Sequence, residues 1–226
     1  MKVISWNCNL KFAKKFEAIE SFNPDICFIQ ECEDLPIDFF SDYQYFWTGR
    51  NNKKGLGILT KDKTASVNKN HDAKLINFLP VNSHGMNLLG VWAYNHRAAR
   101  FGSGFNGNTI DAIGFYRSWL KESDQALVAG DFNNSVIWDK PNNRNNFVEI
   151  NSELNKIGLK SAYHTLTDEA FGEEAKGTLF HTKKESKKYH IDYIYTKALD
   201  CKKLDIGLYA DWIKLSDHTP LFFNSH

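Results

Sequence analysis

Several short apolar runs of this sequence end in, or carry, a carboxylate, amide or imidazole side chain. In chain order these polar side chains are Asn7, Asn9, Glu31, Asp131, Asn133, Asp192, Asp217 and His218. Burying a carboxylate without a partner is expensive, so each is expected to be paired or to lie near the surface at a strand end. Turn chemistry explains any one of them alone, but their recurrence favours a shared rim that holds a cation and an anion.

This combination of side chains supplies what hydrolysis of a phosphodiester requires. Glu31, Asp217 and Asn9 offer the oxygen ligands that a hard divalent cation prefers. An aspartate can orient and deprotonate the attacking water, while asparagine amides and a histidine can donate to the phosphate oxygens as charge develops. The cation would neutralise that charge and assist the leaving oxygen. Zinc is disfavoured, because no His/Cys cluster has ligand spacing.

The elements that must position these side chains are mostly short β-strands. Strands are predicted at residues 2–9, 25–31, 55–61, 87–95, 126–131, 189–196 and 219–223. Helical spacing of apolar residues is found at 12–22, 110–121 and 145–157. This mixture favours a layered α/β sandwich with mixed sheets. Because side chains alternate along a strand, Asn7 and Asn9 are predicted to share one face, as are Asp131 and Asn133.

Length and composition are those of an ordinary globular protein. The chain has 226 residues, of which 42% are hydrophobic and 24% charged, and strong strand signals flank its Gly/Asn-rich loops. We therefore predict a single domain spanning residues 1–226. The N-terminus lacks the long apolar core of a signal peptide, and no apolar run approaches the ~20 residues that cross a bilayer. These features, with four cysteines in no metal-binding spacing, predict a cytoplasmic protein with reduced thiols, no membrane partner and no obligate protein partner.

The overall charge neither favours nor excludes nucleic acid as a binding partner. There are 28 Lys plus Arg against 27 Asp plus Glu, a formal net charge of +1, whereas nucleic-acid-binding domains are often strongly basic. Local basic patches are nevertheless present: Arg50, Lys53 and Lys54; His96, Arg97 and Arg100; and Lys183, Lys184, Lys187 and Lys188. Solvated loops and a polyanion-binding surface are equally good interpretations of these patches.

Five of these motifs, in this order, resemble those of the endonuclease/exonuclease/phosphatase superfamily. They are Ser5-Trp6-Asn7-Cys8-Asn9, Pro24-Asp25-Ile26 through Gln30-Glu31, Gly130-Asp131-Phe132-Asn133, Ile191-Asp192-Tyr193-Ile194 and Ser216-Asp217-His218-Thr219-Pro220. The resemblance spans the chain almost end to end. It implies a four-layer α/β sandwich of two packed mixed β-sheets flanked by helices, with the active site at one edge.

The resemblance also implies roles for individual residues. Glu31 would be the main ligand of Mg²⁺, with Mn²⁺ as an alternative metal, and Asn9 and Asp217 would contribute directly or through water. Asp131 would position or activate the nucleophilic water. The phosphate would be held by Asn7, Asn133 and His218, while Asp192 would fix the tautomer and charge of the imidazole.

Three positions leave alternatives open. Near the end of the strand at 87–95, either Tyr94 or His96 would contact the phosphate or the leaving group, with a slight preference for Tyr94. The superfamily's usual Arg before the Ile-Asp pair is His190 here, which would change the surroundings of Asp192. Thr178 either bonds locally as in an ordinary strand or has a functional role.

These observations predict a metal-dependent hydrolase of phosphate esters, first of all an endonuclease or exonuclease acting on DNA or RNA. The alternative is a phosphomonoesterase or phospholipase of the inositol phosphate or sphingomyelin type. Lys/Arg motifs for additional phosphates are not recognisable in the sequence, which favours the nuclease. A binding module that has kept only the fold is a third reading, and the full set of polar positions argues against it.

Overall fold

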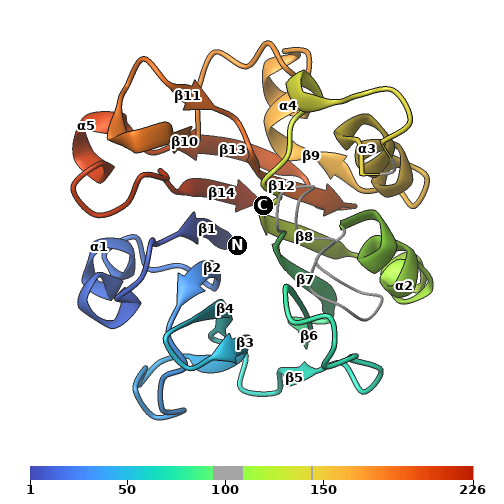
Figure 1. The fold of residues 1–226 in the computed structure, drawn as a ribbon. Coiled ribbons are helices and arrows are strands. Elements are labelled where there is room, and N and C mark those ends of the chain that lie inside the picture. Colours follow the sequence, from blue (N-terminus) through green and yellow to red (C-terminus); the bar gives the residue numbers. More distant parts are fainter. Residues whose placement is uncertain (94–108, 144, 226) are drawn as a thin grey trace.

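The computed structural model describes residues 1–93, 109–143 and 145–225 and contains two six-stranded β-sheets packed face to face (Figure 1). The first sheet has the order β13 (Cys201–Ile206), β14 (Leu221–Ser225), β1 (Lys2–Asn7), β2 (Ile26–Cys32), β4 (Lys54–Thr60) and β3 (Gln44–Asn51). The second has the order β5 (Ser66–Val67), β6 (Phe78–Ser83), β7 (Met86–Trp92), β8 (Ala126–Asp131), β12 (Asp192–Lys197) and β9 (Lys160–Ser161).

Both sheets are mixed, as predicted. Strand β1 is parallel to β2 and antiparallel to β14, and β7 is parallel to β8 while β8 is antiparallel to β12. A separate hairpin pairs β10 (Leu179–Phe180) with β11 (Lys188–Tyr189). The carboxyl ends of β1, β2 and β8 carry the polar residues Asn7, Glu31 and Asp131.

Helices cover the outer faces of the two sheets (Figure 1). Helices α1 (Phe16–Glu20) and α5 (Tyr209–Trp212), with the 3₁₀ turn η1 (Phe12–Lys14), lie on the first sheet. Helices α2 (Thr109–Glu122) and α3 (Phe147–Asn155) lie on the second. The remaining short elements are α4 (Ala162–Thr167), η3 (Val136–Trp138) and η4 (His181–Lys183).

Three apolar cores separate the four layers. Along β1, Val3 points into the core between the sheets, and Ile4 and Trp6 point into the core beneath α1 and α5. Along β8, Leu127 belongs to the core between the sheets and Val128 to the core beneath α2 and α3. Strands buried on both faces read as continuous apolar runs rather than as alternating ones. The predicted four-layer sandwich is confirmed.

The predicted elements are found with shifted ends, and others were missed. Strand β1 ends at Asn7, and β12 begins at Asp192 rather than carrying it in its interior. Asn9 and Asn133 have positive φ values of 50° and 48°, so the strand alternation predicted to place each beside its partner does not reach them. Strands β3, β6 and β13 and helices α4 and α5 were not predicted.

The described residues contain no helix long and apolar enough to cross a membrane. Cys8, Cys27 and Cys32 are buried thiols and Cys201 is partly buried, and all four are free. Burial raises the pKa of the Cys27 thiol and that of the Cys32 thiol. These thiols are therefore neutral packing groups at physiological pH.

Gly130 marks the closest approach between β7 and β8. Its φ is +145°, and a Cβ built on it would lie 1.8 Å from the backbone oxygen of Val91. No side chain fits there without moving the β7 backbone. Because Gly130 immediately precedes Asp131, this contact also fixes where the following carboxylate points.

We therefore expect Gly130→Ala to destabilise the protein by about 2–4 kcal/mol, since it combines an unfavourable φ with a backbone clash. The measurement is the free energy of unfolding from urea titration. Gly114→Ala is the matched control, because a Cβ at this α2 position meets no heavy atom within 4 Å. That control should be neutral or more stable by up to about 1 kcal/mol. A Gly130→Ala protein as stable as wild type would contradict the packing described here.

Candidate active site

Two carboxylates face each other across neighbouring strands at one edge of the second sheet. Asp131 is the last residue of β8, Asp192 is the first of β12, and the two are direct partners in the antiparallel register. Both are buried, with 0% and 1% of their surface exposed. Like charges placed opposite each other in a sheet are destabilising. The pair therefore requires compensation from another part of the chain.

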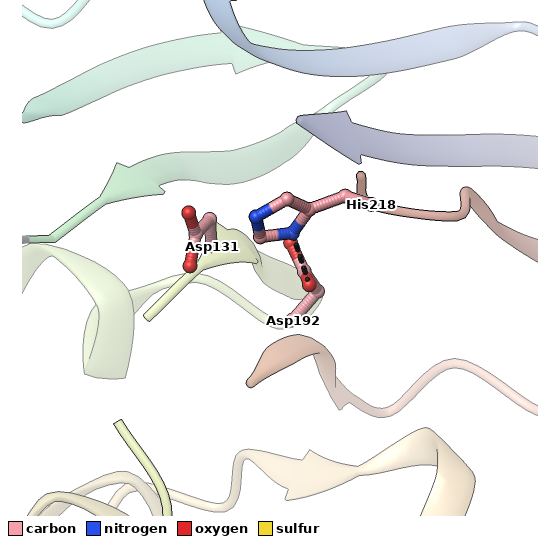
Figure 2. A group of neighbouring side chains, drawn as sticks. All are labelled: Asp131, Asp192 and His218. Atoms are coloured by element: carbon pink, nitrogen blue, oxygen red, sulfur yellow. Dashed lines mark hydrogen bonds and ion pairs between the residues drawn. The ribbon is translucent and has the colours of Figure 1, made fainter. Parts of the chain in front are cut away.

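His218 provides that compensation. It lies in the segment between α5 and β14, is 6% exposed, and its Nδ1 is 2.9 Å from Oδ2 of Asp192. Figure 2 shows the imidazole between the two carboxylates, with its other ring nitrogen on the side of Asp131. One ligand atom from each of the three residues lies within 4.8 Å of the others. The predicted pairing of Asp192 with the imidazole is present in the structure.

Asp131 also receives hydrogen bonds from amides. Asn7 Nδ2, at the end of β1 in the other sheet, donates to Asp131 Oδ2 over 2.9 Å. Asn133 donates through its backbone N–H to Oδ1 over 2.8 Å and through Nδ2 to Oδ2 over 3.0 Å. Asn133 Nδ2 also donates to the backbone oxygen of Ala93. The orientation of the Asp131 carboxylate is thus fixed from both sheets.

The electrostatics of this trio follow from its burial. Burial and the neighbouring Asp192 raise the pKa of Asp131 to about 7, against the opposing effects of His218 and the amide donors. Burial alone would lower the pKa of His218, but the charge and hydrogen bond of Asp192, with Asp131 and Asp217 nearby, raise it to about 10. At neutral pH the imidazole is therefore cationic, and Asp131 is poised to exchange a proton.

A second group of side chains, whose oxygens could serve as metal ligands, lies beside this trio and is more open to solvent. Asn9 Nδ2 donates to Asp217 Oδ1 over 2.8 Å, and the N–H of Leu10 donates to the backbone oxygen of Glu31 over 3.1 Å. Asn9, Glu31 and Asp217 are all partly exposed. Glu31 has a φ of 61° and sits where the β2–β4 register shifts. A bulge of this kind re-aims a side chain out of the regular ladder.

The segment that carries Asp217 and His218 is pinned at several points. Trp6 Nε1 donates to the backbone oxygen of His218 over 3.1 Å, and Ser216 Oγ donates to that of Asn7 over 2.7 Å. The N–H of Phe180 donates to the backbone oxygen of Asp217 over 2.7 Å. These contacts join the two ends of the chain and tie the β10–β11 hairpin to the site. Sequence reasoning had singled out none of them.

Thr178 and His190 support the position of Asp192. The fully buried hydroxyl of Thr178 accepts the N–H groups of Ile191 and Asp192 over 3.0 and 3.1 Å, so it holds the backbone at the start of β12. His190 Nδ1 lies 2.9 Å from the backbone oxygen of Lys176, and burial lowers its pKa. A neutral imidazole anchored to the backbone therefore stands where the resemblance implied an Arg.

The structure thus brings together two hydrogen-bonded groups, Asn7–Asp131–Asn133 and Asp192–His218, at the strand partners Asp131 and Asp192, with Asn9, Glu31 and Asp217 beside them. Tyr94 and His96, between which the sequence left the choice open, lie outside the described residues. The arrangement places a buried carboxylate that can take a proton next to a cation that can bind an anion. Amide donors and partly exposed carboxylates complete it. These are the groups that hydrolysis of a phosphate ester requires, and here an α/β sandwich positions them.

Comparison with known proteins agrees with this class. Residues 4–218 match the model of the endonuclease/exonuclease/phosphatase family. The chain belongs to that family, which places it among the hydrolases of phosphate ester bonds, as its motifs predicted.

Solved structures confirm the fold. The chain is similar to a 3′-5′ exonuclease from Neisseria meningitidis, with 18% identity and a TM-score of 0.77, covering 100% of this chain and 99% of that one. An AP endonuclease from Archaeoglobus fulgidus is similar with 16% identity, a TM-score of 0.74 and the same coverage. A family protein from Leptotrichia buccalis has 14% identity and a TM-score of 0.65.

The Asp192–His218 pair generates a prediction about protonation. Asp192→Asn should lower the pKa of His218 by about 1–3 pH units, because it removes the charge that outweighs burial. An NMR titration of the ring nitrogens measures this directly. His71, whose pKa is lowered by burial and is not influenced by Asp192, is an internal control that should not move. An unchanged His218 titration would contradict the assigned pairing.

The same pair has a consequence for stability. The folded-state pKa of His218 is raised to about 10, above the ordinary value of about 6.5. Its contribution to stability is therefore fully present below about pH 6.5 and is lost as the pH rises towards 10. In Asp192→Asn this part of the pH dependence of the unfolding free energy should become flatter.

Proposed function

We propose that this chain is a Mg²⁺-dependent phosphodiesterase, carried by one catalytic domain, whose substrate is nucleic acid. The main support for the proposal is that one buried cluster contains both a carboxylate that can accept a proton and an imidazole that is held in its protonated form. Asp131 has a pKa raised to about 7, whereas His218, in the same cluster, is held as a cation by Asp192. Hydrolysis of a phosphodiester needs both an acceptor for the proton of water and a donor to the phosphate.

Asp131 is assigned to the attacking water. A general base works best when its pKa lies near the operating pH, and the pKa of this carboxylate is raised to about 7. The donors Asn7 and Asn133 fix the direction of its oxygens. Asn7 Nδ2 gives one N–H to Asp131, and its second N–H is available to a phosphate oxygen.

His218 is assigned to the phosphate. Its Nδ1 is engaged by Asp192, which leaves Nε2 to donate to a non-bridging oxygen. A cationic donor makes a hydrogen bond roughly twice as strong as a neutral one. Because the carboxylate partner fixes both the charge and the orientation of the ring, little reorganisation is needed when charge develops on the phosphate.

Asn9, Glu31 and Asp217 are the residues that would hold Mg²⁺, or Mn²⁺ in its place. Their donor set consists of oxygens, is partly exposed, and includes two carboxylates, which fits a hard divalent cation. The buried trio is the poorer candidate for this ion, because the imidazole of His218 already donates to Asp192. When bound, the ion would neutralise charge on the phosphate and assist the leaving oxygen.

Nucleic acid is favoured as substrate by two observations. The exposed hairpin between β10 and β11 carries Lys183, Lys184 and Lys187, and its backbone is bonded to Asp217 at the site. Basic side chains beside a phosphodiesterase site suit a polyanionic chain. In addition, one similar solved structure is described as a 3′ phosphatase from Neisseria bound to a product DNA hairpin. That description also makes a terminal phosphate monoester the second candidate substrate.

The substrate assignment is tested with purified protein on single- and double-stranded DNA and RNA, linear and circular, with Mg²⁺ or EDTA. Parallel reactions contain a 3′-phosphorylated oligonucleotide, inositol phosphates and sphingomyelin. Cleavage of a nucleic acid that EDTA stops is the expected result. Hydrolysis of a monoester or lipid without cleavage of any nucleic acid would replace the nuclease assignment by the phosphatase or phospholipase alternative.

The residue assignments give a further prediction. Asp131→Asn and His218→Asn should each reduce kcat by about 10²–10⁴-fold, the usual contribution of a proton-transfer or charged group. Circular dichroism should show that both variants are folded. Asp205→Asn and His84→Asn are the matched controls, because the Asp205 side chain is 47% exposed and pairs with Lys203 on β13, and His84 is an exposed residue between β6 and β7. Activity near wild type in either site variant would refute the mechanism.

A further inference from the structure

The carboxylate assigned to the metal already has a cation beside it. Lys54 Nζ lies 3.0 Å from Glu31 Oε2, with 40% and 19% of the two side chains exposed. The same ammonium is 5.3 Å from the ring centroid of Trp92. The mechanism described above gives Lys54 no task, and neither the motifs nor the resemblance pointed to it.

The pairing of β4 with β2 places this ammonium close to the site. Lys54 is the first residue of β4, and the β2–β4 register passes from Gln30↔Leu56 to Cys32↔Gly55, leaving Glu31 in the bulge between them. Trp92 ends β7 and is the register partner of Asp131 on β8. Lys54 therefore reaches from the first sheet, beside Glu31, to the strand end that adjoins Asp131.

Lys54 also lines a cavity of about 80 Å³ beside the site. The other residues around it are Gly49, Arg50, Asn51, Ile76, Asn77 and Trp92. Roughly 10–15 Å³ is enough for one ordered water, so this cavity admits several waters or one anionic group. Its polar lining is cationic or amide in character, which suits an oxygen-rich anion rather than a cation.

Lys54 and a divalent cation have conflicting demands on Glu31. A metal ion bound to this carboxylate would lie within a few ångströms of the ammonium, and like charges at that distance repel each other. The ammonium does not need to leave the site to relieve this repulsion, because its stem is flexible and the neighbouring cavity can hold an anion. A phosphate there would meet the ammonium without displacing the metal.

We propose that Lys54 is a substrate-positioning residue that exchanges partners: it holds Glu31 while no divalent cation is bound, and holds a substrate phosphate in the adjoining cavity once one is. This inference rests on the proposed function, since it takes Glu31 as a metal ligand. Lys54 would therefore weaken metal binding in the free protein and strengthen phosphate binding in the metal-loaded protein. Metal and phosphate would consequently strengthen each other's binding.

The first test measures metal binding without any substrate. Mn²⁺ is titrated into wild type, Lys54→Met, Lys54→Arg and Lys53→Met, and free Mn²⁺ is followed by electron paramagnetic resonance. Lys54→Met should bind Mn²⁺ roughly three- to tenfold more tightly, in keeping with the loss of a partly exposed ion pair and its repulsion. Lys54→Arg keeps the charge and should resemble wild type. Lys53→Met removes an exposed neighbouring lysine and should change little.

The second test measures the opposite effect on the anion. Inorganic phosphate is titrated calorimetrically into the same four proteins at saturating Mg²⁺. Lys54→Met should bind phosphate several-fold more weakly, and in turnover assays it should raise KM while leaving kcat within a small factor of wild type. A side chain that only stabilised the local structure would weaken both ligands or neither. Thermal melting of each variant confirms that it is folded.

A double variant assigns the effect to the Glu31 contact. In a Glu31→Gln background, adding Lys54→Met should tighten Mn²⁺ binding by a smaller factor than it does in wild type, because the competing pair is already broken and only the charge repulsion is left to remove. Mn²⁺ binding to Lys54→Met that is unchanged or weaker than wild type overturns the exchange while leaving the metal-dependent function intact. If wild type binds no divalent cation at all, the metal assignment of the proposed function fails and the exchange fails with it.

Discussion

Asp131 and Asp192 are buried on adjacent strands and lie directly opposite each other. Much of the surrounding structure compensates for this burial of two like charges. Two carboxylates removed from water at this spacing cannot both stay ionised unless a cation is close. The cation that pairs with Asp192 is His218, which comes from the segment that precedes β14 in the other sheet. The pKa of Asp131 is raised by its burial and by Asp192, whereas the pKa of His218 is raised by Asp192 against the opposing effect of burial.

The same constraint couples the packing of the two sheets to the assembly of the site. Both groups that compensate Asp131 and Asp192 from across the interface, Asn7 and His218, belong to the first sheet or its connections. Strands β1 and β14 are neighbours in that sheet, so the two ends of the chain deliver them together. A shift of one sheet past the other would leave buried carboxylates unpaired, and breaking a buried ion pair costs about 3–5 kcal/mol.

Much of this could be predicted from the sequence because polar side chains at the ends of apolar runs are informative. Asp131 follows a run that is buried on both faces, so its position at a sheet edge followed from the cost of burying it elsewhere. Strand β6 was missed because Pro80 interrupts it and normally argues against a strand. Strand β13 was missed because its exposed lysines break the apolar pattern of an edge strand.

The directions of the side chains were harder to predict than their places. Glu31 adopts a positive φ that its residue type does not favour, and it does so because β4 pairs across a bulge. That register depends on residues more than twenty positions away in sequence, as does the contact between Lys54 and Glu31. Local propensity contains no information about either, so neither the bulge nor the ion pair could be read from the pattern.

The two halves of the site are joined by a strained turn, and its strain explains the contacts that Lys15 makes with the backbone of that turn. Asn9, Leu10 and Lys11 are consecutive residues with φ of 50°, 67° and 56°, a conformation that costs roughly 1–3 kcal/mol for such non-glycine residues. Lys15 Nζ donates to the backbone oxygens of Cys8, Asn9 and Leu215 over 2.6, 3.1 and 2.6 Å.

These three hydrogen bonds hold the turn against the segment that carries Asp217 and His218. Asn7 therefore stays directed at Asp131, while Asn9, two residues later, stays directed at Asp217. The proposed proton acceptor and the proposed metal ligands could act on one phosphate only if their separation were fixed to within a fraction of an ångström. Fixing that separation requires the strained backbone of the turn. The three hydrogen bonds of the Lys15 ammonium, which lies outside the cluster, offset that strain.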